Sequence, residues 1–235
     1  HPERARRISL LVEGRDAEAF RIDRRPWQEF VSDATWPLPS EPPPGKPWCL
    51  VRLTRPSAPA TAAGSTQAVP KRYLTPSPFV QSEDPLIREE AQRICGALSG
   101  TWPQTLALAQ WVYQTLRKQL TIGLPLARDV LLSKTGDCHE HTVLFTALAR
   151  SRGIPTRMVA GLVYYGERFF YHAWPEVWVG DHWLPVDPTL GQPVADATHL
   201  GLAEAENEEL VALAQFVGQI RLRVLTIEEE SDSSP

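Results

Sequence analysis

The stretch that decides the fold is Gly136-Asp137-Cys138-His139-Glu140-His141-Thr142-Val143-Leu144-Phe145. Asp137 is followed three residues later by Glu140 and then by an apolar run, a pattern that resembles a capping box with Asp in place of Ser or Thr. The pattern predicts a helix whose N-cap is Asp137 and whose first residue is Cys138, and which runs to about Arg150.

Cys138 is therefore a candidate nucleophile. The first backbone N–H groups of a helix have no partner within the helix, and their partial positive charge favours a thiolate over a thiol. An ordinary half-buried cysteine at the start of a helix gives the same local pattern. The helix alone does not distinguish these two readings.

A predicted hairpin supplies two further candidates. Strands are expected over Phe170–Val179 and His182–Asp187, because the dipeptide Gly180-Asp181 between them is typical of a two-residue hairpin loop. With that loop, His172 and Asp187 are diagonal neighbours on one face of the hairpin, with Cα atoms roughly 7–8 Å apart. An aspartate at that separation can reach an imidazole nitrogen.

Two prolines bear on this register. Pro175 and Pro185 each remove a donor from the hairpin ladder, and a bulge at either one would shift the pairing by one residue. Such a shift would move Asp187 to the other face. In the unshifted register His182 lies on the face opposite the candidates.

The cysteine helix also carries His139 and His141 in its first turn, where a charged imidazole opposes the helix dipole. Either could support the site from a second layer. Their spacing with Cys138 converges poorly on a metal ion, and no matching pair of ligands stands elsewhere. We therefore expect neither a metal nor another cofactor.

The surrounding pattern predicts an α+β domain, with helices packed on an antiparallel sheet and the candidate nucleophile at a helix N-terminus. One helix is expected from Asp84 to Gly100 and a second from Gln104 to Lys118. The apolar middle of Thr156–Tyr165 predicts a strand covered on both faces.

The chain before this domain is rich in proline. Half of the 22 prolines fall between Pro37 and Pro78, so most of that stretch is expected to be an extended connection. Ile8–Val12 and Trp48–Leu53 are predicted to be short strands. Residues 1–70 are thus interpreted as a β-rich or Pro-rich N-terminal segment of unknown role.

The remaining boundaries follow from charge. Residues 71–225 are predicted to form the main domain, and residues 226–235 an acidic, solvated tail. The formal net charge of −4 argues against a nucleic-acid partner. No run of 18 apolar residues occurs, so no membrane span is expected.

Two features of the chain leave alternatives open. It begins with His1 and shows no signal-peptide pattern, which fits either a processed chain or an excised piece. Its three cysteines allow three thiols or one disulfide, including one that joins Cys138 to Cys49 or Cys95. The oligomeric state does not follow from the sequence.

The chain resembles the transglutaminase-like superfamily, in its bacterial branch, at several motifs that follow one another in the same order. The resemblance covers roughly residues 82 to 200 and excludes residues 1–70. It is carried by four segments: Gly136-Asp137-Cys138, the helix end Ala147-Leu148-Ala149-Arg150-Ser151-Arg152-Gly153-Ile154-Pro155, His172-Ala173-Trp174-Pro175-Glu176-Val177, and Trp183-Leu184-Pro185-Val186-Asp187-Pro188-Thr189.

The resemblance implies a papain-like cysteine site, with Cys138 as nucleophile, His172 as base and Asp187 orienting the imidazole. The backbone N–H of Cys138 would be one oxyanion donor, and Gln119 is a candidate for the second by position only. Three tryptophans could line an acyl cleft or pack in the core: Trp174, Trp178 and Trp183.

The implied chemistry is acyl transfer on a peptide or isopeptide amide through a cysteine thioester. Hydrolysis, as in a cysteine peptidase, is the first expectation, with a peptide or protein as substrate. Transamidation of protein glutamine by the same triad is one alternative, and a binding or scaffold module without turnover is another. The family setting favours an extracytoplasmic location, in the periplasm or the cell envelope.

Overall fold

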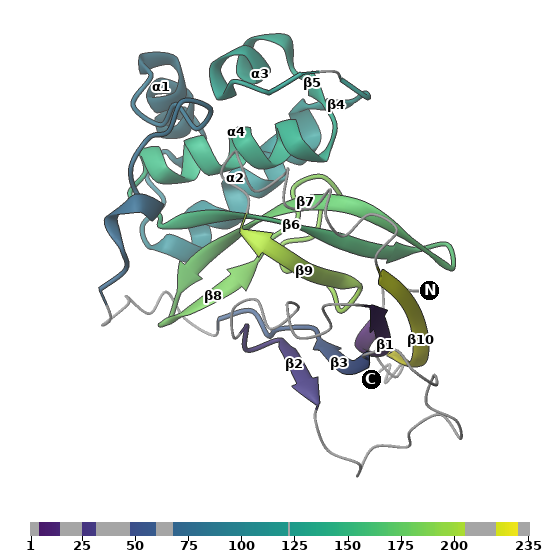
Figure 1. Ribbon diagram of the computed structural model, residues 1–235. Helices are drawn as coiled ribbons and strands as arrows, with labels where there is room; N and C mark the ends of the chain where they lie inside the picture. The colour runs from purple at the N-terminus through teal and green to yellow at the C-terminus, as the bar shows by residue number, and fades with distance from the viewer. Residues whose placement is uncertain are drawn as a thin grey trace, which may run out of the picture.

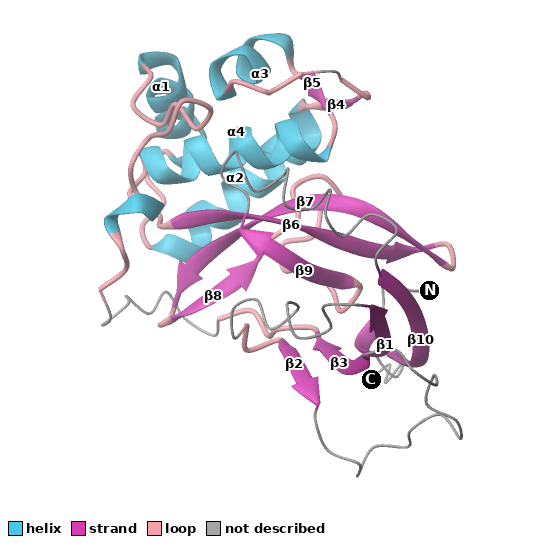
Figure 2. Ribbon diagram, viewed as in Figure 1, coloured by secondary structure: helices cyan, strands magenta, loops and turns pink. Residues whose placement is uncertain are grey.

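The computed structural model describes residues 5–14, 25–31, 48–59, 68–121, 123–204 and 220–229. They are arranged in three layers: helices on one side, a central four-stranded sheet, and a second four-stranded sheet on the far side (Figures 1 and 2). The two sheets are antiparallel throughout. This confirms the predicted α+β class, with helices packed on an antiparallel sheet.

The helical layer contains α1 (Pro85–Cys95), α2 (Thr101–Thr115), α3 (Ala127–Ser133) and α4 (Cys138–Ser151). Asp84 caps α1 by accepting the N–H of Leu86 at 2.9 Å, as its sequence pattern predicts. This helix ends earlier than predicted because Gly96 takes a positive φ of 50°. The short helix α3 was not predicted, and α4 runs one residue past the predicted Arg150.

The central sheet contains β6 (Thr156–Tyr165), β7 (Arg168–Val179), β8 (His182–Pro185) and β9 (His199–Glu204), in the order β8-β7-β6-β9. Val179 pairs with His182 across the hairpin, as predicted. Both loop residues have positive φ, as a two-residue hairpin turn requires. The ladder ends at Pro185, so Asp187 lies beyond the strand and not within it as predicted.

A glycine in the middle of β6 lets the sheet close around a tryptophan. A Cβ atom on Gly161 would lie 2.1 Å from the carbonyl oxygen of Leu200 and 2.7 Å from the ring of Trp174. Only glycine permits β9 and Trp174 to approach this closely. Trp174 is fully buried there, so it is a core residue and lines no cleft.

The second sheet contains β1 (Ala5–Gly14), β2 (Gln28–Val31), β3 (Trp48–Thr54) and β10 (Ile220–Glu229), in the order β10-β1-β3-β2. β1 and β3 include the two predicted N-terminal strands and extend them. The pairing of β10 with β1 brings the C-terminal part of the chain back to its start (Figure 1).

This pairing corrects the predicted boundary between residues 225 and 226, which falls inside β10. Residues 226–229 are exposed, but they are paired strand residues and not a free tail, since Ile227 pairs with Ile8 and Glu228 with Arg7. Residues 230–235 and most of the proline-rich stretch before Trp48 lie outside the described residues.

Two hydrophobic cores hold the layers together. One lies between the helices and the central sheet, around Leu144, Leu148 and Met158. The other lies between the two sheets, where Ile8 and Leu10 of β1 share a cluster with residues of β6, β7 and β9. The second core shows that the N-terminal strands cover the central sheet. None of the helices in the described parts of the chain is long and apolar enough to cross a membrane.

Candidate active site

The candidate nucleophile sits where the sequence predicts it, at the first residue of α4. The Asp137 carboxylate accepts the N–H of His139 at 2.9 Å, and the Glu140 carboxylate accepts the N–H of Asp137 at 3.0 Å. This is the predicted capping box. Cys138 is half-buried and begins the helix, where backbone N–H groups lack intrahelical partners.

Gly136 makes room for this cap. A Cβ atom at Gly136 would lie 2.2 Å from the Cβ atom of Glu140, so a larger residue would force the capping carboxylate away. Gly136 belongs to β5 (Thr135–Gly136), which pairs in parallel with β4 (Arg117–Lys118). Its carbonyl accepts the N–H of Gln119 at 3.1 Å. The segment holding Gln119 is thus tied to the loop before Cys138, and its role as second oxyanion donor stays a prediction.

A buried hydrogen bond fixes the cysteine helix on the histidine strand. The hydroxyl of Thr142, on the second turn of α4, donates to the carbonyl oxygen of Ala173 at 3.0 Å. Ala173 follows His172 on β7. The nucleophile and the imidazole are therefore carried by two elements that are bonded directly to each other.

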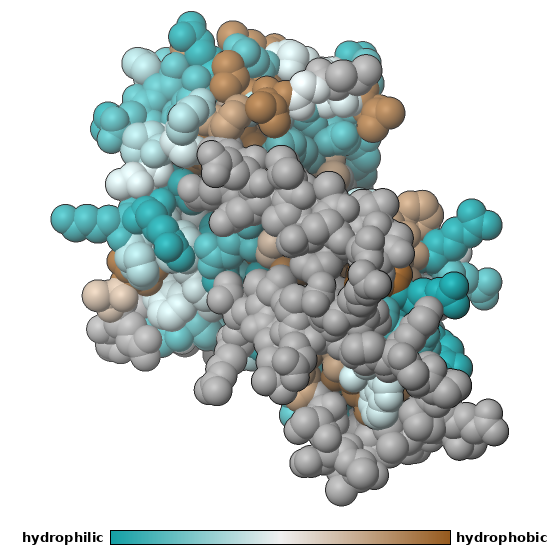
Figure 3. All heavy atoms as spheres, viewed as in Figure 1, coloured by the Kyte–Doolittle hydropathy of each residue, from teal (hydrophilic) through white to brown (hydrophobic). Residues whose placement is uncertain are grey.

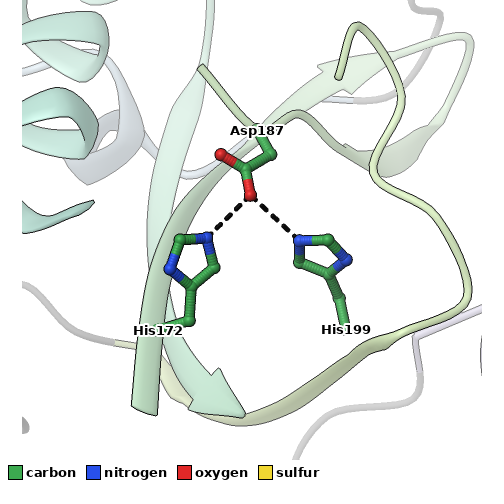
Figure 4. A group of neighbouring side chains, drawn as sticks. All are labelled: His172, Asp187 and His199. Carbon is green, nitrogen blue, oxygen red and sulfur yellow. Dashed lines mark hydrogen bonds and ion pairs between the residues drawn. The ribbon is translucent and has the colours of Figure 1, made fainter. Parts of the chain in front are cut away.

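His172 and Asp187 are in contact. The Nε2 atom of His172 lies 2.7 Å from Oδ2 of Asp187 (Figure 4), and Cys138 lies near enough to His172 to raise the pKa of the imidazole. Because Nε2 is used by the aspartate, Nδ1 is the nitrogen left for the thiol. The structure thus brings all three predicted site residues together, and their catalytic roles stay a prediction.

Asp187 is held by its own turn. Its Oδ1 atom accepts the N–H groups of Thr189 at 2.7 Å and Leu190 at 2.8 Å. Its backbone pairs with that of Gln192 in both directions. These bonds close the turn after β8 and aim the second carboxylate oxygen at the imidazole. The side chain is completely buried.

The opposite charges of His172 and Asp187 stabilise each other. Burial alone would lower the pKa of His172, but the charge and hydrogen bond of Asp187, followed by the nearby Cys138, raise that pKa to about 10. Burial alone would raise the pKa of Asp187, but the charges and hydrogen bonds of His172 and His199 hold it well below its usual range. The favoured state is imidazolium beside carboxylate.

His199, the first residue of β9, was not predicted to belong to the site. Its Nε2 atom lies 3.0 Å from the same Oδ2 atom of Asp187, on the other side from His172 (Figure 4). Its Nδ1 atom lies 3.1 Å from Oδ1 of Asp196. A local pattern could have revealed His199: Asp196 lies three residues before it, and the apolar run Leu200-Gly201-Leu202 follows it directly.

The same side chains are the candidates for holding a metal. In the described part of the chain, His172, Asp187 and His199 form the one group whose ligand atoms converge, all within 4.8 Å of one another. These atoms are bonded to each other through the two Nε2 protons. A divalent cation would have to displace both protons, so the arrangement fits a proton-holding cluster better than a metal centre.

The other candidates fall outside this cluster. His141 is buried and its Nδ1 atom lies 2.6 Å from the carbonyl oxygen of Asp137, which ties it to the helix start. Burial lowers its pKa, so it is a neutral group of the second layer. His182 contacts the carbonyl oxygen of Gly180 on the hairpin loop. All three cysteines are free thiols, so no disulfide joins Cys138 to another residue.

Two of the remaining tryptophans pack across the hairpin. Trp178 and Trp183 are directly paired, with ring centroids 5.3 Å apart at an interplanar angle of 72°. Trp183 also meets Tyr73 at 4.7 Å. These contacts make the pair part of the sheet edge, and they give no support to the predicted acyl cleft.

A cavity of about 180 Å³ opens beside the start of α4. Glu140 and Thr121 line it on the helix side, and their side chains are hydrogen-bonded to each other. Its other walls come from the segment after β4 and from α3: Gly123, Leu124, Pro125, Leu126, Asp129, Val130, Ser133 and Thr135. Hydrophobic side chains gather at this end of the molecule, over α3 (Figure 3).

Residues 83–188 match the family model of the Transglutaminase-like superfamily. The similarity to this superfamily is therefore confined to these residues, which make up less than half of the chain. The match ends just after Asp187 and includes Cys138 and His172, while β9 and the second sheet lie outside it. No curated protein matches the chain at a significant level.

A solved structure shares the fold of this chain. A "putative cysteine protease" from Cytophaga hutchinsonii aligns over 98% of this chain and 93% of its own, with a TM-score of 0.59 and 16% identity. The alignment includes the N-terminal strands, so the fold is shared well beyond the core. The periplasmic domain of TgpA from Pseudomonas aeruginosa aligns over 62% of this chain and 55% of its own, with a TM-score of 0.46 and 22% identity.

Proposed function

We propose that this protein transfers acyl groups from peptide or isopeptide amides through a thioester on Cys138, and that water is the usual acceptor. One observation carries the proposal. An imidazole is bonded through Nε2 to a buried carboxylate at 2.7 Å, and a cysteine at a helix start lies near enough to raise the pKa of that imidazole. That constellation is what activation of a thiol nucleophile requires.

The steps follow from the positions of the protons. Before substrate binds, Nδ1 of His172 holds the proton given up by the Cys138 thiol, and the thiolate sulfur then attacks the amide carbon to form a tetrahedral oxyanion. The imidazolium then gives that proton to the leaving amine as the C–N bond breaks, which leaves a thioester. Water attacks the thioester carbon, His172 takes its proton, and the C–S bond breaks to release a carboxylic acid and the thiol.

The surroundings of the site favour a peptide as substrate. The cavity beside α4 has about the volume of one or two side chains, and apolar and polar residues share its walls. Leu124 lines the cavity and exposes 62% of its surface, and Leu120 and Leu132, which adjoin the lining residues Thr121 and Ser133 along the chain, expose 84% and 62%. Exposed apolar side chains around a cavity are typical of a surface that binds an extended, partly apolar chain.

Transamidation by the same residues is the alternative, since an amine can attack the thioester in place of water. A scaffold that keeps the fold without turnover is less consistent with the site, because a scaffold has no need of a buried carboxylate aimed at an imidazole. An extracytoplasmic location is part of the proposal on the family resemblance. Fractionation of the native host would test it.

The test is alkylation of Cys138 by iodoacetamide across a pH series, followed by mass spectrometry of the peptide that contains it. We expect a rate plateau that begins well below pH 8.5, the region where an unperturbed thiol ionises, and at least a tenfold slower reaction near neutral pH in His172→Ala. Cys95 is buried and Cys49 half-buried, and they serve as internal references. A Cys138 that reacts as an ordinary thiol, and equally in His172→Ala, refutes the proposal.

Turnover is tested on a library of acyl peptides with water alone and with added primary amine. Release of a free acid supports hydrolysis, and incorporation of the amine supports transamidation. An activated Cys138 that yields neither product over the library would support the scaffold reading.

A further inference from the structure

His199 is a buried histidine whose two ring nitrogens both face oxygen atoms. Nε2 lies 3.0 Å from the Asp187 carboxylate, and Nδ1 lies 3.1 Å from the Asp196 carboxylate. The other atoms near Nδ1 are the Asp196 carbonyl oxygen at 3.3 Å and the Thr198 hydroxyl at 3.4 Å. No solvent reaches the ring, since its side chain is 0% exposed.

The hydrogen-bond inventory fixes its protonation. A carboxylate only accepts, so each nitrogen that faces one must carry a proton. The single proton of the Thr198 hydroxyl is already donated to Asp196 Oδ1, so that hydroxyl cannot supply Nδ1. His199 therefore carries protons on both nitrogens and is an imidazolium.

The two carboxylates are equally constrained. Asp187 receives four donors, from Thr189, Leu190, His172 and His199, which fills the acceptor sites of a carboxylate. The acceptor sites of Asp196 are occupied by donors from the segment around it: Gln192 Nε2, the backbone N–H and hydroxyl of Thr198, and His199. The Asp187 carboxyl, with two donors on each oxygen, has no place for its own proton, and the Oδ1 atom of Asp196 that faces His199 accepts three donors.

We propose that His199, clamped by Asp196, is a positioning residue of the reaction centre: a permanent imidazolium that aims Asp187 at His172 and offsets part of its negative charge. The inference rests on the proposed acyl transfer. It adds two residues, Asp196 and His199, that lie beyond the family core at residues 83–188.

The positive charge of His199 affects proton transfer by His172. A fully buried aspartate in contact with His172 would hold the imidazolium proton too firmly for delivery to a leaving amine. The ring of His199 lies 5.8 Å from that of His172, centroid to centroid. A positive charge at that distance weakens the hold of His172 on its proton and makes His172 a better general acid.

The charged and titratable groups around His199 come from several elements. Asp187 lies on the turn after β8, Asp196 precedes β9, and His172 lies on β7. Farther out, the charge of Asp187 acts on His141 of α4, and that of His172 acts on Asp137, the N-cap of α4. Burial opposes a charge on His199, and the hydrogen bonds and charges of Asp187 and Asp196 outweigh it, so the pKa of His199 is raised.

The first readout is independent of turnover. Nitrogen-15 NMR of the histidine rings in the intact chain should show two rings that each hold two N–H protons well above pH 7, those of His172 and His199. The signals of the His199 ring should be lost in His199→Gln and retained in His182→Gln. His182 is the matched control because it contacts only the hairpin loop. A ring of His199 that titrates near pH 6.5, or that holds one proton at pH 8, overturns the inference.

The second readout is the pH profile of Cys138 alkylation. His199→Gln keeps a donor for Asp187 but removes the charge, so the alkaline limb of the profile, where His172 loses its proton, should move up. A charge 5.8 Å away at an effective dielectric constant of about 20 corresponds to about two pH units. The negative charge of Asp196, on the far side of His199, cancels part of the effect of His199 on His172. The alkaline limb is therefore expected to shift by about one pH unit.

Two further variants complete the test. His199→Ala removes the donor as well and should lower the plateau rate constant at least tenfold, with the plateau rescued by His199→Gln. If His199→Gln fails to fold, Asp196→Asn replaces it, and His199 should then lose its second proton at a lower pH than in the parent chain.

The outcomes separate the two proposals. An activated Cys138 whose alkaline limb does not move in His199→Gln overturns the role of His199 and leaves acyl transfer standing. A wild-type Cys138 that is not activated refutes the acyl transfer, whatever the protonation of His199.

Discussion

Replacing Glu176 by glutamine should destabilise the protein strongly, because this carboxylate joins the second sheet to the central one. Glu176 is completely buried on β7. Its Oε1 atom accepts from Nε of Arg25 at 2.9 Å, and its Oε2 atom accepts from Nε and Nη2 of Arg157 at 2.7 and 2.6 Å. Glu176→Gln keeps the shape of the side chain but leaves both guanidinium groups facing a neutral amide.

The expected cost follows from that burial. Removing one partner of a buried ion pair costs about 3–5 kcal/mol, because the remaining charge stays out of water without compensation. Arg157 keeps a second carboxylate, Glu204 at 2.7 Å, so the cost should lie near the lower end, about 3 kcal/mol. For a chain of this size that corresponds to a fall in Tm of roughly 6–12 °C.

The assay is urea denaturation followed by tryptophan fluorescence, since Trp27 and Trp174 both lie in the core between the sheets. The matched control is Glu29→Gln. That residue pairs with Arg52 at 3.0 Å but its side chain is 61% exposed, so the change should cost less than about 1 kcal/mol. If Glu176→Gln is no more destabilising than the control, the buried pair does not hold the sheets together and the reasoning is wrong.

Three other predictions concern the site itself. The pKa of His172 is raised from 6.5 to about 10, so its contribution to stability should be complete below about pH 6.5 and lost as the pH rises to 10. The urea midpoint should therefore fall over that range, and the fall should be smaller in His172→Gln. Gly136→Ala should cost roughly 1–3 kcal/mol and slow alkylation of Cys138, because its Cβ atom would lie 2.2 Å from that of Glu140 and break the cap; unchanged stability and alkylation would contradict this account of the cap. Treatment with EDTA should leave the alkylation profile of Cys138 unchanged, and a slower reaction after chelation would show a metal at the convergent ligand atoms.

The parts of the site that the sequence predicts are those set by neighbours along the chain. The capping box needs only Asp137 and Glu140, and it placed Cys138 at the start of its helix. The hairpin register needs only Gly180-Asp181, and it sets β8 beside β7 as far as Pro185; the turn that follows then places Asp187 beside His172. Local hydrogen bonds determine such features, so the sequence carries them almost completely.

The second sheet was only partly predictable. Ile220-Arg221-Leu222-Arg223-Val224 alternates apolar and charged residues, which is the pattern of a strand with one covered face. The glutamates that follow this stretch led to the prediction of an acidic tail. Its partner, β1, lies more than 200 positions earlier, and no local feature identifies it.

His199 illustrates the same limit at the site. Whether a histidine meets Asp187 depends on β9 pairing with β6, and that pairing requires Gly161 to admit β9 and Trp174 at its centre. A glycine inside an apolar strand is a weak signal on its own, because it also fits a bulge or an unpacked position. The three-dimensional arrangement turns it into a requirement: a side chain at position 161 would push β9 away and take the imidazolium of His199 off Asp187. The position of His199 beside Asp187 therefore depends on residues, such as Gly161, that have no polar side chain.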